Sequence, residues 1–172
     1  MSGATRTGYK SLVAAASNVT EGWVDLSDEA ATARLAGRVA REARRGDAIA
    51  LSGELGAGKT SFARAFIRAC GAPEEVPSPS FTLVQTYDTP RGAVSHFDLY
   101  RLSRPEEIEE LGLDEALAEG IVLIEWPDRL AGFAPPDRLD IALLPGAAPE
   151  ARRARLRGDR SWSARLPRIL AA

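Results

Sequence analysis

Residues 53–60 of the chain read Gly53-Glu54-Leu55-Gly56-Ala57-Gly58-Lys59-Thr60. The pattern Gly-x4-Gly-Lys-Thr is typical of a P-loop, which binds the phosphates of a nucleotide. Its glycines let backbone N–H groups turn inward around the phosphates, where a Cβ would obstruct them. Lys59 offers a compact ammonium to the β- and γ-phosphate oxygens, and the hydroxyl of Thr60 is a ligand for Mg²⁺. The stretch therefore predicts a magnesium-dependent nucleotide site.

The residues on either side of this loop have the expected character. Residues 48–51 (Ala-Ile-Ala-Leu) predict a short buried strand, and residues 60–70 predict a helix that Gly71 ends. The N-terminus of that helix adds N–H groups and a positive dipole end to the phosphate site. The chain has 20 arginines but only two lysines, and one of the two is Lys59. An arginine fork would not fit beside the phosphates as a slim ammonium does.

The remaining pattern predicts an α/β fold in which strands alternate with helices. Ser27 is expected to cap a helix that Gly46 stops, and Ser103 with Glu106 forms a capping-box pattern. We expect helices at residues 27–45 and 103–112, strands at residues 81–87, 93–97, 121–124 and 138–144, and a terminal hairpin of two short segments joined at residues 158–159. The expectation is a P-loop NTPase fold, with a mixed and mostly parallel sheet flanked by helices and a C-terminal hairpin. Residues 1–20 are expected to be a flexible extension and residues 21–172 a single domain.

Two acidic residues follow predicted strands and are candidates for the magnesium site. Asp98 follows a rather polar strand, whereas Glu125 follows the apolar run at residues 122–124. The carboxyl end of a strand beside the P-loop is where a second protein group for Mg²⁺ is usual. One acid could approach the ion while the other orients the attacking water, and a surface or capping role for either remains an alternative.

Other candidate residues have two readings each. The hydroxyls of Ser80 and Thr82 follow a proline-rich bend, so this loop either responds to the γ-phosphate as a switch or is a turn before an edge strand. Trp126 either stacks on a partner or packs at the edge of the core. His96, the only histidine, is either a structural hydrogen-bonding residue or a base, and the structural role is expected.

Composition excludes several classes of protein. One cysteine, Cys70, leaves no internal disulfide and no zinc cluster. No apolar run approaches the roughly 18 residues of a membrane span, so a cytoplasmic protein is expected. The net charge is −2, but residues 151–172 hold seven arginines against one acid. That basic end either meets an anionic partner or forms a solvated, arginine-rich strand pair.

Motifs that are absent from the sequence narrow the class of nucleotide-binding protein. No Asn-Lys-x-Asp run for guanine occurs, so adenine is the expected base. No arginine-rich lid typical of small-molecule kinases is evident, although such a kinase remains an alternative. A binding module that switches partners with negligible turnover is a further alternative.

Several ordered motifs give the chain a more specific resemblance. They are the P-loop itself, Ser78-Pro79-Ser80-Phe81-Thr82-Leu83-Val84, His96-Phe97-Asp98-Leu99-Tyr100-Arg101-Leu102, Leu111-Gly112 and Ile124-Glu125-Trp126-Pro127. With residues 26–32, they resemble the TsaE (YjeE) family over roughly residues 24–158. The family's threonine stands as Ser80 here, which keeps the hydroxyl.

The resemblance implies both a function and site residues. It implies a P-loop ATPase that acts with TsaB and TsaD, and with tRNA through that complex. Those partners install threonylcarbamoyl on the adenosine next to the anticodon of tRNAs that read ANN codons. It implies that residues 55–60 (Leu55, Gly56, Ala57, Gly58, Lys59 and Thr60) hold the phosphates, that Thr60 and Glu125 bind Mg²⁺, and that Glu29 lies on the nucleotide side. Asp98 and Trp126 match functional positions of the family.

Overall fold

A single seven-stranded sheet forms the centre of the computed structural model, which describes residues 19–73, 75–79 and 81–171. The strand order is β1-β7-β6-β2-β5-β4-β3. The strands are β1 (Thr20–Leu26), β2 (Ala48–Ser52), β3 (Val84–Thr89), β4 (Gly92–Asp98), β5 (Gly120–Glu125), β6 (Arg138–Pro145) and β7 (Arg152–Gly158). The helices are α1 (Glu29–Glu42), α2 (Lys59–Ala69), α3 (Glu107–Glu110), α4 (Leu113–Glu119), the 3₁₀ segment η1 (Pro127–Phe133) and α5 (Leu166–Leu170).

The sheet is parallel in the middle and antiparallel toward its edges. Strand β2 pairs in parallel with β5 and β6, and β4 pairs in parallel with β5. The pairs β1–β7, β6–β7 and β3–β4 are antiparallel. This mixed sheet, with the P-loop between β2 and α2, confirms the predicted P-loop NTPase fold. The expectation of a mostly parallel sheet is wrong, because three of the six strand pairings among the described residues are antiparallel.

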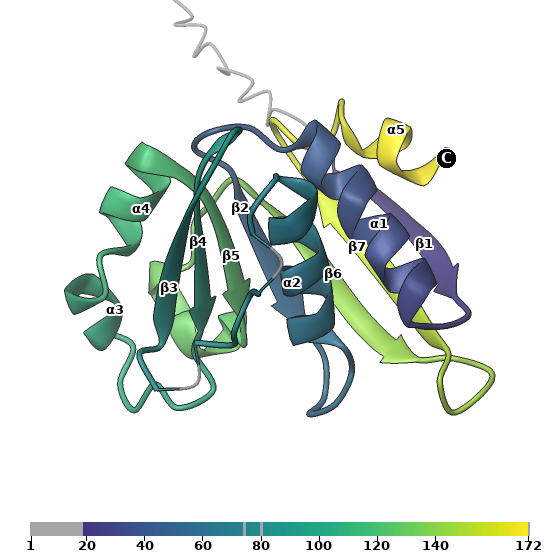
Figure 1. The fold of residues 1–172 in the computed structure, drawn as a ribbon, viewed down its shortest axis with the longest axis horizontal. Coiled ribbons are helices and arrows are strands. Elements are labelled where there is room, and N and C mark those ends of the chain that lie inside the picture. Colours follow the sequence, from purple (N-terminus) through teal and green to yellow (C-terminus); the bar gives the residue numbers. More distant parts are fainter. Residues whose placement is uncertain (1–18, 74, 80, 172) are drawn as a thin grey trace, which may run out of the picture.

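The helices lie against the sheet (Figure 1). Two clusters of buried hydrophobic side chains pack between them and the strands. Helices α1, α2 and α5 contribute to one cluster, and α3, α4 and η1 contribute to the other, over β4 and β5. Side chains of β5 alternate between them: Ile121 and Leu123 face the first cluster, and Val122 and Ile124 face the second. Because β5 is covered on both faces, its sequence is a continuous run of apolar residues, Ile121 to Ile124. The helices of the described residues include none that is long and apolar enough to cross a membrane.

Some local expectations are wrong in detail. Asp28, rather than Ser27, caps α1, because its carboxylate accepts the N–H of Ala31 at 2.8 Å. The proposed capping box at Ser103 is not formed: α3 begins only at Glu107 and has no side-chain cap. The sheet strand predicted from residue 81 begins at Val84.

The two ends of the described chain also differ from expectation. The hairpin predicted with its turn at residues 158–159 is not formed. Strand β7 instead forms an antiparallel hairpin with β6, and the chain after Gly158 leads into the short helix α5. Strand β1 starts at Thr20 and pairs with β7, which the sequence reading did not predict. The expected flexible extension lies almost wholly outside the described residues.

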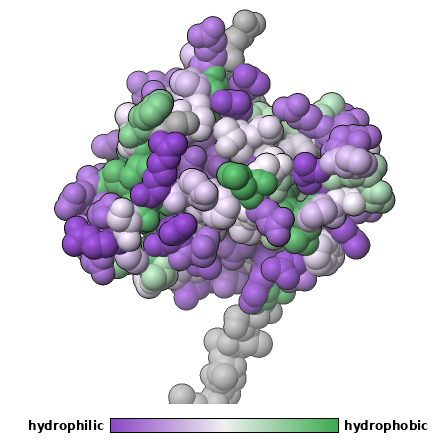
Figure 2. All heavy atoms as spheres, turned by 90° about the horizontal axis from the view of Figure 1, so that it is seen from below, coloured by the Kyte–Doolittle hydropathy of each residue, from purple (hydrophilic) through white to green (hydrophobic). Residues whose placement is uncertain are grey.

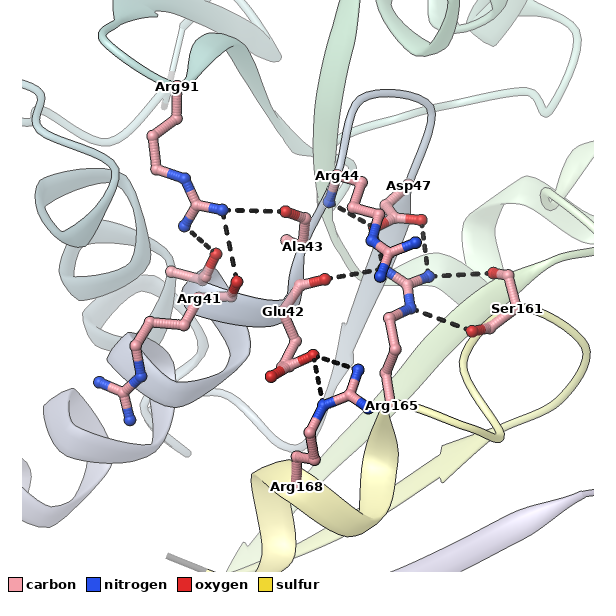
Figure 3. A network of polar contacts seen from close by, with 10 residues as sticks. Arg41, Glu42, Ala43, Arg44, Asp47, Arg91, Ser161, Arg165 and Arg168 are labelled. Carbon is pink, nitrogen blue, oxygen red and sulfur yellow. Dashed lines mark hydrogen bonds and ion pairs between the residues drawn. The ribbon is translucent and has the colours of Figure 1, made fainter.

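A buried ion pair joins α5 to the body of the molecule (Figure 3). The guanidinium of Arg165 donates to both carboxylate oxygens of Asp47, at 2.6 and 2.9 Å, and to the carbonyl of Glu42 at 2.8 Å. Arg91 reaches the same end of α1 from the β3–β4 turn and donates to the carbonyls of Ala40 and Ala43. Two arginines from distant segments therefore satisfy carbonyls that the end of a helix leaves open.

Candidate nucleotide-binding site

Three glycines of the P-loop have backbone conformations that favour glycine. The φ angles are 143° at Gly53, 81° at Gly56 and 102° at Gly58. A Cβ at Gly53 would lie 2.6 Å from the carbonyl oxygen of Leu143, so this position is also closed to a side chain by packing. The loop is therefore a backbone cradle whose shape depends on the absence of side chains.

Lys59 is buried at the start of α2 and its ammonium is held inside the loop. Its Nζ donates to the carbonyls of Gly53 at 2.7 Å and Glu54 at 2.8 Å. The same atom lies 4.1 Å from the ring centroid of Trp126, within cation–π range. Burial lowers the pKa of Lys59, and the charges of Glu125 and nearby aspartates oppose that shift. Lys59 is also one of the residues that line the pocket at this end of the sheet.

The side chains of Thr60 and Glu125 are in hydrogen-bond contact in the site. The Thr60 hydroxyl lies 3.0 and 3.1 Å from the two carboxylate oxygens of Glu125. Glu125 is buried at the end of β5, where it also contacts Nε2 of His96 at 2.8 Å. Nδ1 of His96 has no hydrogen-bond partner among the described residues, so we assign the proton to Nε2, which donates to Glu125. His96 is thus a structural partner of the site, in line with the sequence reading.

Asp98 stands beside Glu125 because their strands are parallel neighbours. The two residues are paired in register at the ends of β4 and β5, as the sequence reading expected of strands that share an edge. One Asp98 oxygen accepts the N–H of Tyr100 at 3.2 Å. Burial raises the pKa of Asp98, and the Glu125 carboxylate raises it further. A raised pKa brings a carboxylate closer to the range of a general base.

The pocket at this end of the sheet collects most of the predicted residues. Its lining consists of Leu55, Gly56, Gly58, Lys59, Thr60, Ser61, Asp98, Tyr100, Glu125 and Trp126. Trp126 has a left-handed φ of 59°, and its ring lies 4.9 Å from that of Tyr100. Strained backbone of this kind concentrates at functional sites. The view onto this end shows mostly hydrophilic side chains with scattered hydrophobic ones (Figure 2).

The residues present fit Mg²⁺ bound together with a nucleotide. The described residues contain no group of three or more His, Cys, Asp or Glu side chains that could hold a metal ion by themselves. Magnesium in nucleotide sites is held instead by one or two protein oxygens and the substrate phosphates. Thr60 and Glu125 offer a hydroxyl and a carboxylate already in contact. This donor set suits a hard cation.

Glu29 and Thr82 do not line the pocket. Glu29 is exposed at the first position of α1. The Thr82 hydroxyl donates to the carbonyl of Val84, two residues along the chain, at 2.9 Å. Ser80 lies outside the described residues. The switch role of this loop stays a prediction.

Arg152, at the start of β7, contacts the backbone of the P-loop. The sequence alone did not identify this residue as part of the site. Its guanidinium donates to the carbonyls of Gly56 and Ala57, both at 3.2 Å. In a planar trans peptide the C=O and N–H point in opposite directions. Holding the Ala57 carbonyl therefore fixes the N–H of Gly58 on the side away from Arg152. Arg152 is a positioning residue for the cradle.

Comparison with known proteins agrees with this geometry. The family model described as "Threonylcarbamoyl adenosine biosynthesis protein TsaE" matches residues 26–154, which contain the P-loop and both acidic residues. The chain belongs to the TsaE family. The sequence similarity covers most of this chain and most of each of the two TsaE proteins compared below. The TsaE protein of Rickettsia felis is 42% identical over 119 residues, which are 69% of this chain and 70% of that protein.

Two matches from Bacillus subtilis, one of sequence and one of structure, extend the TsaE comparison. Its protein named for tRNA threonylcarbamoyladenosine biosynthesis is 37% identical over 113 residues, which are 65% of this chain and 70% of that protein. The crystal structure of YdiB superposes with a TM-score of 0.73 at 27% identity. That superposition covers 89% of this chain and 95% of YdiB. The similarity of fold thus reaches beyond the residues that the family model matches.

Proposed function

We propose that this TsaE protein binds and hydrolyses ATP with Mg²⁺, and that it acts with TsaB and TsaD in forming the threonylcarbamoyl group on tRNA. The proposal places the protein in the cytoplasm, without a membrane partner. It contacts tRNA indirectly, through the complex with TsaB and TsaD. The observation that carries it is the convergence of Lys59, Thr60 and Glu125 on one pocket behind a glycine cradle. Membership of the TsaE family supports the tRNA-modification role.

Each residue has a task in this mechanism. The Lys59 ammonium leaves the carbonyls of Gly53 and Glu54 and contacts the β- and γ-phosphate oxygens. Thr60 and Glu125 would hold Mg²⁺, which would neutralise charge on the phosphates. Asp98 lies next to Glu125, and its raised pKa suits a residue that orients the attacking water and accepts its proton. Glu29 and the Ser80–Thr82 segment are expected to approach the nucleotide from outside the pocket.

Phosphate release from ATP tests the proposal. We expect slow Mg²⁺-dependent release by the chain alone and a changed rate when TsaB and TsaD are both added. The Lys59→Ala variant should lose release in both conditions. Transfer of the γ-phosphate to an added alcohol or phosphate acceptor would indicate the alternative, a small-molecule kinase. Complex formation that depends on ATP without any turnover would indicate a binding module.

A further inference from the structure

Among the described residues, strand β1 leaves one edge of the sheet open. It is the terminal strand of the sheet, and its hydrogen-bonded neighbour is β7 (Figure 1). The strand is seven residues long, from Thr20 to Leu26. The free edge of such a strand presents N–H and C=O groups on which another extended chain can pair.

A groove of about 550 Å³ lies between this strand and helix α1. Its lining residues are Val24, Asp25, Leu26, Ala31, Arg34, Gly37, Arg38 and Arg41. Apolar side chains of β1 and the start of α1 line it together with three arginines of α1. The volume falls within the roughly 300–1,000 Å³ usual for ligand sites.

Gly37 in the middle of α1 has no explanation in the packing of the described residues. A Cβ at this position would meet none of their atoms within 4 Å. Glycine in a helix interior lowers helix stability relative to alanine. Glycine therefore does not stabilise the fold at this position. Because it has no side chain, it leaves space in the groove for the close approach of another chain.

The arginines concentrate positive charge along the groove. Arg34, Arg38 and Arg41 are four and three residues apart, so they lie on one side of α1. Burial lowers the pKa of Arg38, and repulsion from Arg41 and Arg34 lowers it further. The one acid in the lining, Asp25, pairs with Arg153 at 3.4 Å. The guanidinium of Arg41 extends away from the polar network at the end of α1 (Figure 3).

We propose that this groove is the docking site for an extended acidic segment of a partner protein. The segment adds as a strand on the free edge of β1 and places carboxylates against the arginines of α1. A polypeptide fits better than a nucleic acid, because the edge of β1 offers alternating backbone donors and acceptors and the floor is apolar. The proposal does not rest on nucleotide binding, since no residue of α1 or β1 lines the P-loop pocket.

The test uses the full chain and a fluorescein-labelled octapeptide of alternating glutamate and valine, without nucleotide. We expect binding by fluorescence anisotropy, and none for the peptide with lysine in place of glutamate. The double variant Arg34→Glu/Arg41→Glu should weaken binding roughly tenfold or more. The matched control Arg155→Glu/Arg157→Glu makes the same charge change on exposed positions of β7 and should weaken it far less.

A second variant separates docking from folding. Gly37→Leu should abolish binding by filling the groove, while the melting temperature stays equal or rises because helix propensity improves. Amides of β1 should exchange hydrogen more slowly when the peptide is present. Equal losses in both double variants, or unchanged binding in Gly37→Leu, would overturn the proposal. So would a groove that binds an RNA oligonucleotide or a second copy of the chain and not the peptide.

Discussion

The hydroxyl of Thr60, at the start of α2, lies 3.0 and 3.1 Å from the two carboxylate oxygens of Glu125, at the end of β5. Sixty-five positions separate the two residues in the chain. Strand β5 lies directly beside β2 in parallel, so the end of β5 and the P-loop that follows β2 share one edge of the sheet. The parallel pairing therefore assembles the proposed magnesium ligands.

Removing the hydroxyl of Thr60 should strongly lower the rate of ATP hydrolysis without unfolding the protein. We expect Thr60→Ala to lower kcat by roughly 100-fold, on the order of 3 kcal/mol of transition-state stabilisation, because one of two proposed protein ligands is lost. Thr60→Ser should retain most of the activity. Phosphate release across a Mg²⁺ titration measures the effect, with Thr86→Ala as the control, because the Thr86 hydroxyl contacts Ser95 and does not line the pocket. Unchanged turnover in Thr60→Ala would remove Thr60 from the site.

Asp98 should carry a stability cost that depends on pH. Its folded-state pKa is raised by burial, so the charged form destabilises the fold at neutral pH. Asp98→Asn should therefore raise the melting temperature at pH 7 while it lowers ATP hydrolysis. The gain should shrink as the pH falls through the raised pKa toward the ordinary value of about 3.9, since Asp98 then becomes neutral as well. Melting curves between pH 4 and pH 7 would contradict this account if the difference grew on acidification.

Arg152 should matter for nucleotide affinity more than its neighbour on the same strand. Arg152→Ala frees the peptide planes of Gly56 and Ala57, and we expect ATP binding to weaken about 3- to 10-fold, with kcat little changed. Arg153→Ala is the matched control, because Arg153 contacts Trp23 and Asp25 instead of the P-loop. Titration with a fluorescent ATP analogue measures both variants. Rescue of Arg152→Ala by added guanidinium would support a positioning role, and equal affinities would refute it.

The ion pair of Arg165 with Asp47 should contribute strongly to holding α5 in place. Both side chains are buried, and Arg165→Leu leaves a carboxylate without its partner, so we expect a loss of about 3–5 kcal/mol in the free energy of unfolding. Arg168→Ala, on the same helix, breaks a more exposed pair with Glu42 and should change it little. Urea unfolding followed by circular dichroism compares the two. Similar losses would mean that burial is not what makes the first pair important.

Much of the site could be predicted because its information is local. The P-loop has a sequence spacing of its own, and strand ends that carry acids identify Asp98 and Glu125. Strand β1 was missed although Trp23 and Asp25 alternate with Val24 and Leu26, since that short pattern means little until β7 is known to pair with it. The helix cap was misplaced by one residue because Ser27 and Asp28 are both good caps.

The arginine-rich end shows what depends on three-dimensional structure. Charge alone predicted either an anionic partner or a solvated strand pair. The structure assigns its arginines to different tasks: Arg152 holds the P-loop, Arg165 and Arg168 bind the end of α1, and Arg153, Arg155 and Arg157 are exposed on β7. These roles depend on antiparallel pairing and on α5, which contains Pro167 and is too short to have a clear helical period.

A crystal structure with Mg²⁺ and a non-hydrolysable ATP analogue tests the central claim most directly. We expect the triphosphate in the glycine cradle, with Nζ of Lys59 moved from the carbonyls of Gly53 and Glu54 to the phosphate oxygens and with Mg²⁺ on Thr60. A nucleotide bound elsewhere, or a Lys59 that stays on those carbonyls beside a bound triphosphate, would contradict it.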